Sequence, residues 1–328
     1  MKIEINTHEK NMLRFADEHP EALVLSADLG SSCEIKKFRS TYPERYLTMG
    51  IAEQNMCSWA AGLAREGYRP FLHTFAVFLY RRILDQLEMS VAYPNLPVVF
   101  VGFVPGITTP GGVTHQAIND VATLRAVPNM AIFDIGDATE IEGVLDLAYE
   151  YNGPVYIRML RKEVPRLFPA SEPMQFNRAR ILSRGTDVVI LSSSICTEEA
   201  MRATAVLTEK GLSIQHLHVS TLKPFTDPTI VEAIRNSKYG AVTIENHLVT
   251  GGLGSAVADV IAENGIGKRL IKIGLTSYPH GASKIYLMNK YGIGAMNLVD
   301  AVESLTDNSL GIHESDLEEV RFVDFLEV

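Results

Sequence analysis

Short, strongly apolar segments alternate with longer amphipathic segments along almost the whole chain, and this alternation constrains the fold most. Apolar runs bounded by turn residues are typical of strands buried on both faces, and the segments between them have helical spacing. The sequence therefore predicts the α/β class, as two doubly wound α/β domains with mainly parallel sheets. The predicted strands are 22–26, 97–104, 130–135, 154–159, 187–193, 212–219, 239–245 and 269–275, and the predicted helices are 7–18, 51–66, 75–92, 115–126, 138–151, 196–210, 227–237, 253–264 and 295–305.

The length of 328 residues favours two domains over one. The alternation breaks where Pro165, Pro169 and Pro173 recur at four-residue intervals, as in an interdomain linker. We therefore predict a first domain at 1–165, a linker at 166–180 and a second domain at 181–328. The acidic tail from Ile312 onward is expected to form a terminal strand or a docking segment.

Charge and composition exclude several classes of partner. The formal net charge of −9 argues against nucleic acid and against an anionic membrane. The N-terminus is charged throughout and so does not resemble a signal peptide, and the longest apolar run is too short to span a bilayer. The three cysteines are widely spaced, which favours free thiols in the cytoplasm over disulfides.

A single carboxylate, Glu53, lies in the otherwise uncharged segment "MGIAEQNM" (49–56). None of the residues three or four positions away on the predicted helix is a cation. Glu53 is either a helix-start charge stabilised by the macrodipole, or a desolvated carboxyl that shares a proton with a ligand nitrogen.

An aromatic stripe follows in "PFLHTFAVFLYRRILDQLEM" (70–89). Helical spacing would place Phe75 and Phe78 on one face, with Phe71 and Tyr80 beside them. Such a stripe is either ordinary core or a stacking wall for a flat heteroaromatic ring.

Two further segments follow predicted strands, where the ligands of parallel sheets gather. "GITTPGGVTHQAIND" (106–120) carries His115, expected at or near the start of the next helix; alternatively, Thr114 caps that helix and His115 is half-exposed. "RMLRK" carries Arg158, Arg161 and Lys162, which either receive a phosphate or carboxylate or are solvated charges.

Taken together, these segments resemble the transketolase family, in its pyrimidine-binding domain followed by its C-terminal domain. "MGIAEQNM" resembles the family's G-[IV]-x-E-[QH]-x-M motif, and "GGVTHQAIND" its D-G-P-T-H-Q loop. "HTFAVFLYRRILDQL" is similar to the aromatic segment between them, and "GPVYIRMLR" to a strand that ends in a ligand-facing arginine. "STLKPFTDPTIVEAI" and "ENHLVTGGLGSAVADVI" resemble the C-terminal domain, so the resemblance covers essentially the whole chain.

The resemblance implies thiamine diphosphate as the cofactor. Glu53 would then be catalytic: it would hydrogen-bond N1′ of the cofactor's aminopyrimidine ring and so promote deprotonation of the thiazolium carbon. Phe75 and Phe78 would wall the ring, and Asp28 and Ile51 are also expected beside the cofactor.

The resemblance likewise implies a ketol transfer. In this reaction a two-carbon unit moves from a ketose, expected to be phosphorylated, to an aldose. His115 would act as the second catalytic residue by contacting the carbonyl oxygen or hydroxyls of the substrate. Ser32 and Arg161 would bind the substrate, with Arg161 at its anionic end.

A family motif, the G-D-G…N segment that holds Mg²⁺ and the diphosphate, is not found in the sequence. The chain therefore resembles the small subunit of a split enzyme and is expected to carry no metal ligands of its own. A large subunit would hold Mg²⁺ and share the cofactor, in an α₂β₂ assembly in which the small subunits also associate with one another.

The matched segments also depart from the family in places that concern the substrate. Gly111 stands where the family has an Asp that recognises the stereochemistry of the donor's hydroxyls. Phe103 stands near the position of a phosphate-contacting His of the family, and Asn6 or His8 near the position of an Arg. The phosphate cluster thus keeps only Ser32 and Arg161, which leaves another phosphate placement or another anionic tail open. Two alternative functions also stay open: a β-subunit of a 2-oxo-acid dehydrogenase or a deoxyxylulose-phosphate-synthase-like enzyme, and a non-catalytic assembly partner.

Overall fold

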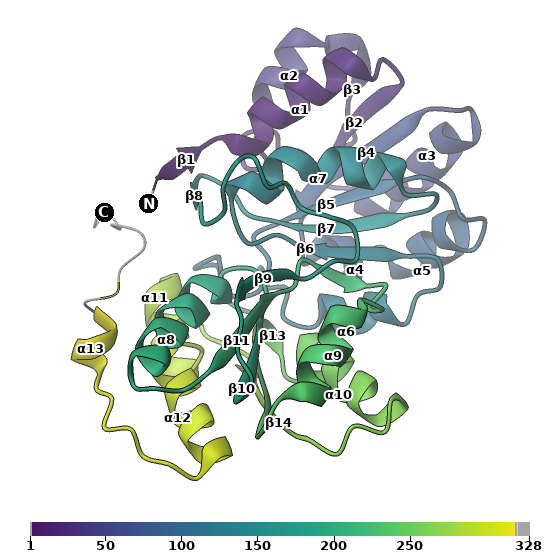
Figure 1. The fold of residues 1–328 in the computed structure, drawn as a ribbon. Helices are drawn as coiled ribbons and strands as arrows, with labels where there is room; N and C mark the ends of the chain where they lie inside the picture. The colour runs from purple at the N-terminus through teal and green to yellow at the C-terminus, as the bar shows by residue number, and fades with distance from the viewer. Residues whose placement is uncertain (1, 319, 321–328) are drawn as a thin grey trace.

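The chain forms two β-sheets covered by helices in the computed structural model, which describes residues 2–318 and 320 (Figure 1). The first sheet has the order β12-β6-β7-β5-β4-β2-β3 and the second the order β14-β13-β10-β11-β9. All neighbouring strands are parallel except β12–β6 and β9–β11, which lie at sheet edges. The strands are β2 (Ala22–Ser26), β3 (Tyr46–Thr48), β4 (Arg69–Phe75), β5 (Val99–Phe103), β6 (Ala131–Asp134), β7 (Val155–Met159), β9 (Arg180–Ser183), β10 (Val188–Ser192), β11 (Ile214–His218), β12 (Thr221–Lys223), β13 (Gly240–Leu248) and β14 (Arg269–Leu275).

A short antiparallel ribbon joins β1 (Ile3–Ile5) to β8 (Glu163–Pro165), beside the first sheet. The helices of the first half are α1 (Thr7–Glu18), α2 (Lys36–Thr41), α3 (Glu53–Arg65), α4 (Phe78–Arg81), α5 (Leu84–Gln86), α6 (Asp120–Arg125) and α7 (Ala138–Glu150), with a 3₁₀ turn at Pro43–Arg45 and a π-helical turn at Leu87–Ala92. Those of the second half are α8 (Cys196–Glu209), α9 (Pro228–Asn236), α10 (Leu253–Glu263), α11 (Lys284–Tyr291), α12 (Ala295–Thr306) and α13 (Glu314–Glu318).

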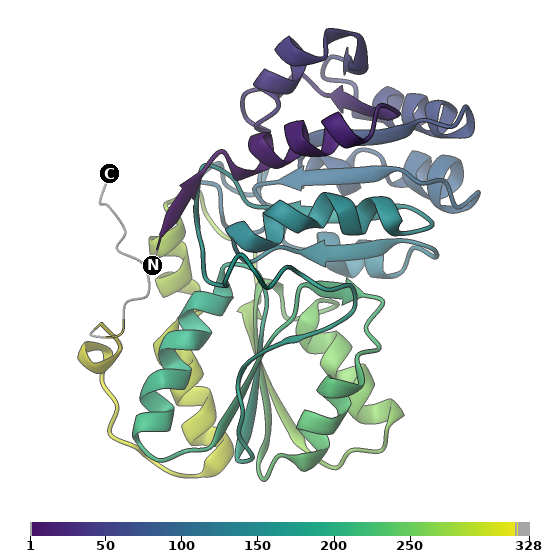
Figure 2. The same cartoon turned by 45° about the horizontal axis from the view of Figure 1, so that its top comes forward.

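Both faces of the first sheet are buried, as the apolar strand runs predict. Successive side chains of a strand point to opposite faces, so Val24 packs in the core that contains α1 and α7, whereas Leu23 and Leu25 pack in the core that contains α3. The second sheet is sandwiched in the same way, between α8 and α12 on one side and α9 and α10 on the other (Figure 2). The predicted fold class, two doubly wound and mainly parallel α/β sheets, is confirmed.

The predicted helix 75–92 begins too early and is interrupted, since the structure has separate helical turns at Phe78–Arg81, Leu84–Gln86 and Leu87–Ala92. Residues Arg69–Phe75 form β4, a strand hydrogen-bonded to β2 and β5 in the middle of the sheet, and the chain turns helical only at Phe78. Phe71 is consequently buried in the core rather than part of an aromatic helix face. The short spacing of the aromatic residues imitates a helix because the strand and the following helical turn are joined almost directly.

The predicted helix start at 115 is also wrong, since α6 begins at Asp120. Thr114 therefore does not cap a helix, and His115 lies in a turn-rich loop between β5 and α6. This loop is a separate structural unit, held by contacts described below.

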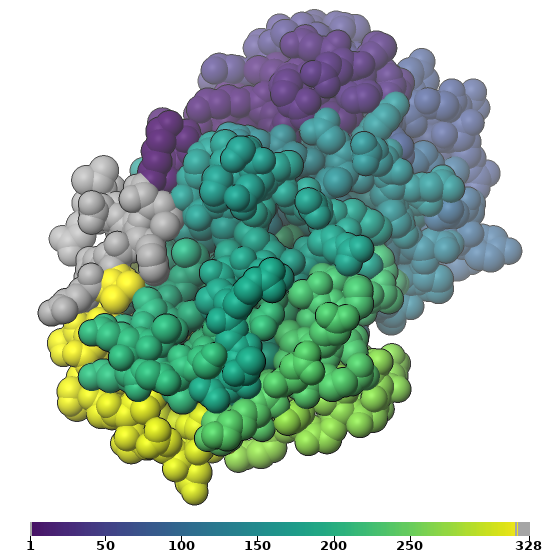
Figure 3. Space-filling model, in the orientation of Figure 1, coloured from purple at the N-terminus to yellow at the C-terminus, as the bar shows by residue number. Residues whose placement is uncertain are grey.

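The two halves of the chain are interlocked rather than simply joined. Strand β12 comes from beyond the predicted linker, yet it pairs with β6 at the edge of the first sheet. A single apolar cluster also runs from Phe100 in the first sheet to Leu191 in the second. Figure 3 shows the resulting continuous packing of the two halves. The division at 165 and 181 stays a prediction.

The described part of the acidic tail forms the short helix α13, not a strand, and residues 321–328 lie outside the described residues. No helix in the described ranges is both long and apolar enough to cross a bilayer.

Candidate functional site

The predicted site residues gather at the carboxyl ends of the central parallel strands. Phe75, Phe103 and Met159 are register partners at the ends of β4, β5 and β7. The loops that carry His115 and Arg161 leave from β5 and β7, directly above these partners. The α/β topology therefore brings together side chains that are far apart in the sequence.

Three aromatic rings form the centre of the cluster. Phe75 and Phe78 are stacked with centroids 6.0 Å apart and planes inclined by 27°. The His115 ring meets both edge-on, at 6.1 Å from Phe75 and 5.7 Å from Phe78. A strand-to-helix turn, rather than one helix face, thus brings these rings together, and their role as a wall for a cofactor ring stays a prediction.

Glu53 is the first residue of α3 and is only 4% exposed. Its carboxylate accepts a hydrogen bond from Arg82, with Nη1 2.6 Å from Oε1. The same guanidinium lies over the Phe78 ring, with Cζ 3.8 Å from the ring centroid. A charge-assisted hydrogen bond and a cation–π contact thus link Glu53 to the aromatic cluster.

Arg82 is a site residue that the sequence reasoning missed. The helical neighbours of Glu53 include no cation, and Arg82 belongs to a segment 29 residues further along the chain. The available signal was the Arg81–Arg82 pair within an otherwise apolar and aromatic segment. Two adjacent cations in such a segment indicate buried or half-buried partners.

Arg81 holds the loop that carries His115. Its Nη1 donates to the carbonyl of Val113 (2.8 Å), its Nη2 to that of Gln116 (3.4 Å), and its Nε to the Tyr80 hydroxyl (2.8 Å). From the other side, Gln116 Nε2 donates to the carbonyl of His280 in the second half of the chain (3.2 Å). The loop is therefore fixed between the two halves of the molecule.

Arg161 and Ser32 are neighbours, and their assignment to the substrate stays a prediction. Arg161 Nη1 donates to the backbone carbonyl of Ser32 at 2.9 Å. The guanidinium lies 5.4 Å from the Phe75 centroid, so the predicted anion-binding residue borders the aromatic cluster.

Asp28 and Ile51 lie at the same sheet edge, after β2 and β3, and both are exposed. Within the part of the chain that the structure describes, no hydrogen bond or ion pair connects either side chain to the cluster. Their assignment to the cofactor stays a prediction.

Arg158, by contrast, cannot receive a ligand. It is fully buried, and its guanidinium binds Asp120 (2.8 Å) and Asp134 (2.9 Å) as well as the backbone carbonyls of Ala117 and Asn246. The two carboxylates raise the pKa of Arg158 above its usual value. This arginine connects the two halves of the chain. The sequence predicted either an anion-binding residue or a solvated charge at this position, and Arg158 is neither.

The three positions that depart from the family's phosphate cluster supply no exposed cation. Phe103 is buried with its ring against His8, 5.2 Å between centroids. His8 shares a hydrogen bond with His73, 3.0 Å between their Nε2 atoms, and burial lowers the pKa of both. Asn6 is an exposed residue that precedes α1.

Among the described residues, one group has carboxylate and imidazole atoms close enough to hold a metal ion: Glu18, His19 and Asp146. It precedes β2, at the opposite end of that strand from Asp28. Arg14 already pairs with Glu18 (3.2 Å) and with Asp146 (2.5 Å), so these carboxylates are neutralised without an ion.

Comparison with known families agrees with both halves of this architecture. Residues 5–166 match "Transketolase, pyrimidine binding domain", and residues 177–298 match "Transketolase, C-terminal domain". A solved structure described as a split-gene transketolase, an inactive β4 tetramer, superimposes with a TM-score of 0.85 at 36% identity, covering 92% of this chain and 97% of that one.

Among curated relatives, the 6-deoxy-6-sulfo-D-fructose transketolase subunit SqwH of Clostridium sp. (strain MSTE9) is 35% identical, over 92% of this chain and 94% of its own. A putative transketolase C-terminal section of Methanocaldococcus jannaschii is 34% identical, over 89% and 93%. The 1-deoxy-D-xylulose-5-phosphate synthase of Symbiobacterium thermophilum is 32% identical over 90% of this chain, which spans only 45% of that enzyme.

Proposed function

This chain belongs to the transketolase family, and we propose that it is the small subunit of a two-component, thiamine diphosphate-dependent transketolase. It would transfer a two-carbon ketol unit from a ketose to an aldose once a large subunit supplies the diphosphate-binding domain and Mg²⁺. The chain spans 94% of one split-subunit relative and 97% of a split-gene structure, which supports the two-component reading. We further propose an α₂β₂ assembly in which small subunits also contact each other.

The observation that carries this proposal is the buried carboxylate of Glu53, which Arg82 links to the ring of Phe78, against which the His115 ring packs. A flat nitrogen heterocycle needs an aromatic wall and a carboxylate at its edge, and the present residues fit both needs. Glu53 would accept the hydrogen bond of the ring nitrogen, and Phe75 and Phe78 would exclude water from it. When bound, the cofactor supplies the nucleophilic carbon that accepts the ketol unit.

The substrate end of the site depends on His115, Ser32 and Arg161. His115 is held over the aromatic wall, where its ring can donate to a carbonyl or hydroxyl oxygen of the sugar. Arg161 offers a guanidinium to an anionic tail. The sulfosugar in the name of one relative supports an acidic group other than phosphate as an option for that tail.

The alternatives weighed from the sequence are weaker explanations. The match to a deoxyxylulose-phosphate synthase covers under half of that enzyme, and the split-subunit relatives match over nearly their whole length. A non-catalytic partner would have no need for a buried carboxylate paired with a stacked arginine. The three cysteines are all free and buried, which supports the cytoplasm as the location of the complex.

Reconstitution tests the proposal. We expect the purified chain alone to show neither cofactor binding nor turnover, and both to appear when a large subunit with a G-D-G…N segment is added. In the complex, Glu53→Gln should slow the exchange of the cofactor's C2 hydrogen severely, whereas Gln54→Glu, an exposed neighbour, should not. Robust ketol transfer by the chain alone would exclude the two-component reading, and unchanged exchange in E53Q would reduce Glu53 to a helix-start charge.

A further inference from the structure

The loop of residues 106–117, which carries His115, is held at its start by a side chain of the second half. Asn246 Nδ2 donates to the carbonyl of Pro105 (3.1 Å), and Asn246 Oδ1 accepts from the amide of Ile107 (2.9 Å). The side chain is fully buried, and these two bonds satisfy both ends of its amide. One asparagine thus fixes the backbone on both sides of the point where the chain enters the loop.

The apolar residues at the two ends of the loop are also built into the second half. Ile107 and Ile118 are buried and belong to the same core cluster as Ile190 and Ile244, which lie in β10 and β13. In addition, the amide of Leu248 donates to the carbonyl of Ile118 (2.9 Å). The loop therefore leaves a strand of the first sheet, but both of its ends are packed in the core of the second.

An irregularity at the end of β13 accompanies these contacts. The register between β13 and β14 shifts between Ile244 and Leu248. Irregularities of this kind re-aim side chains and are frequent next to active sites. The shifted segment includes the buried Asn246 and His247, and the His247 ring accepts a hydrogen bond from the amide of Ala122 in α6 (3.3 Å). This end of β13 thus contacts the first half on both sides of the loop.

The backbone at the start of the loop needs such support. Val104, a β-branched residue, has φ +53°, and Gly106 has φ +57°. Left-handed backbone is unfavourable at a β-branched residue and persists only where the surrounding structure holds it. A Cβ at position 106 would overlap the amide group of Asn246. The glycine therefore allows the close approach through which the asparagine holds the strained segment.

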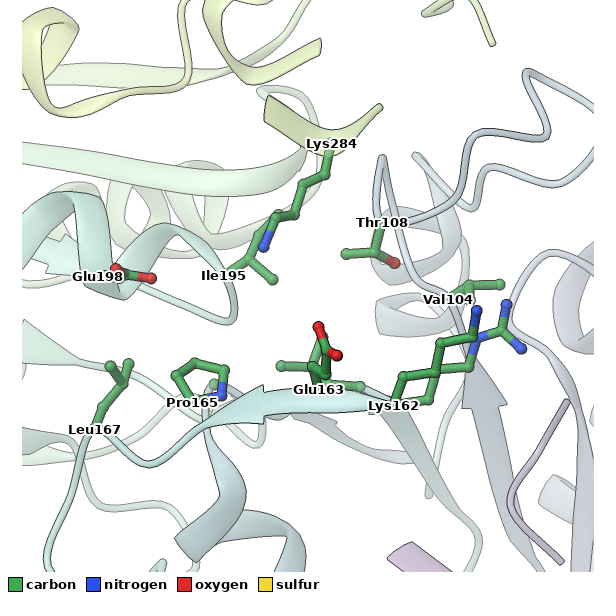
Figure 4. A pocket seen from close by; sticks show the side chains of 12 residues that line it. Val104, Thr108, Lys162, Glu163, Pro165, Leu167, Ile195, Glu198 and Lys284 are labelled. Carbon is green, nitrogen blue, oxygen red and sulfur yellow. The ribbon is translucent and has the colours of Figure 1, made fainter. Parts of the chain in front are cut away.

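The other flank of the loop start is open. A pocket of about 260 Å³ lies there between the two halves of the chain. Val104 and Thr108 line it from the first half, and Ile195 lines it from the second (Figure 4). The loop start consequently has space into which it can move, so its position depends on specific bonds and not on close packing alone.

We propose that the second half sets the position of His115, and that Asn246 is the positioning residue through which it does so. This inference rests on the proposed function, in which His115 contacts the sugar. A displacement of a catalytic group by about 1 Å can cost on the order of a hundredfold in rate. The second half would therefore control turnover through the loop.

The first test follows the loop in the full-length chain by hydrogen–deuterium exchange. In Asn246→Ala, the amides of His115 and Gln116 should exchange about tenfold faster or more, although both donate to the carbonyl of Gly112 and not to Asn246. Asn246→Asp keeps an acceptor for the amide of Ile107 but loses the donor, so it should give a smaller increase. This milder variant decides the question if N246A does not fold.

Asp227 provides the matched control. Its buried carboxylate likewise binds backbone amides, those of Ala179 and Thr229, but neither amide lies in the loop or in β13. Asp227→Ala should leave the exchange of the His115 amide unchanged. Equal exchange of this amide in the Asn246 variants and in the unmodified chain would overturn the inference.

The second test uses the reconstituted complex and separates ketol transfer from activation of the cofactor. In N246A, kcat for ketol transfer should fall about tenfold or more. Exchange of the cofactor's C2 hydrogen, assigned above to Glu53, should change less than about twofold. A general loosening of the chain would lower both rates together, and that result would contradict a positioning role for Asn246.

A double variant shows whether Asn246 acts through His115. If it does, N246A should lower the kcat of a His115→Ala complex less than about twofold, far less than it lowers that of the unmodified complex. Fully additive losses would exclude the positioning role. Absence of ketol transfer by the unmodified complex with every sugar would instead refute the proposed function, and amide exchange in the free chain would still decide whether Asn246 holds the loop.

Discussion

Arg82 changes how the carboxylate of Glu53 should be understood. A lone buried carboxylate is unstable, yet Glu53 is held by a guanidinium that also stacks on Phe78. A planar cation that donates to a carboxylate and covers an aromatic ring makes the contacts that the proposed cofactor ring needs. Arg82, whose side chain is 43% exposed, therefore pairs with the buried Glu53 from the surface, and we propose that it positions this carboxylate.

Removal of Arg82 should affect both stability and cofactor binding. We expect Arg82→Ala to lower the free energy of unfolding of the free chain by about 1–3 kcal/mol, because Glu53 loses its partner. In the reconstituted complex it should raise the cofactor concentration for half-maximal activity, and Arg82→Lys, which keeps the charge but not the flat group, should fall between. Urea titration and cofactor titration measure the two effects. Tighter cofactor binding in R82A would mean that the guanidinium competes for the ring's place.

His216 gives a test of pH dependence at a single residue. It is fully buried on β11, its Nε2 is hydrogen-bonded to Ser192 Oγ (2.8 Å), and burial lowers its pKa from 6.5 to about 3. The folded chain thus keeps this ring neutral where the unfolded chain protonates it. Stability from His216 is complete above pH 6.5 and is lost as the pH falls from 6.5 towards 3, by about 1.4 kcal/mol per pH unit.

The difference between two variants isolates that contribution from the many other titrating groups. His216→Gln should remove this slope from a plot of unfolding free energy against pH between 6 and 4. His313→Gln, at an exposed histidine, should keep it. Parallel curves for H216Q and the unmodified chain would contradict the assignment.

At the scale of elements, the sequence predicted the sheets well and the segment around β4 poorly. Strands with long β-branched runs, such as β5 and β10, were found at their places because burial on both faces requires such runs. Strand β4 carries Pro70, His73 and Thr74 among aromatic residues, and periodicity alone cannot separate such a strand from a helix start. The site residues nevertheless came together, because sheet topology decides which loops meet.

The loop of residues 106–117 offers an element-scale prediction. Arg81→Ala removes donors to the carbonyls of Val113 and Gln116, so the amides of His115 and Gln116 should exchange with deuterium several-fold faster. The reconstituted complex should also lose kcat, since His115 is less well placed. Arg65→Ala, at the exposed end of α3, is the control and should change neither value. Unchanged exchange in R81A would show that Gln116 and His280 hold the loop unaided.

At the scale of the whole molecule, the least predictable feature is the buried contact between the halves. From sequence, Arg158 looked like Arg161, since both lie near the carboxyl end of the same strand, but Arg158 is within β7 and Arg161 follows it. Their difference depends on Asp120 and Asp134, which reach Arg158 only in the folded chain. The partners that a side chain contacts across an interface cannot be deduced from the local sequence pattern. The role of Arg158 could therefore not be predicted from the sequence.

Arg158→Met should therefore destabilise the entire chain. Two carboxylates would be left buried without their cation, at a cost of about 3–5 kcal/mol in the free energy of unfolding. Arg14→Met, which removes a solvent-exposed arginine with two acidic partners, should cost about 0–1 kcal/mol. Urea titrations of both variants make the comparison. A loss below 1 kcal/mol in R158M would show that the two carboxylates find other partners.

The position of β12 limits how this gene can be divided. A fragment that ended in the stretch between the two family matches would lack the strand that covers β6. Residues 131–134, all fully or almost fully buried, would then form an open sheet edge that can pair with other chains. The first half produced alone should therefore aggregate unless a substitute for this edge strand is supplied with it.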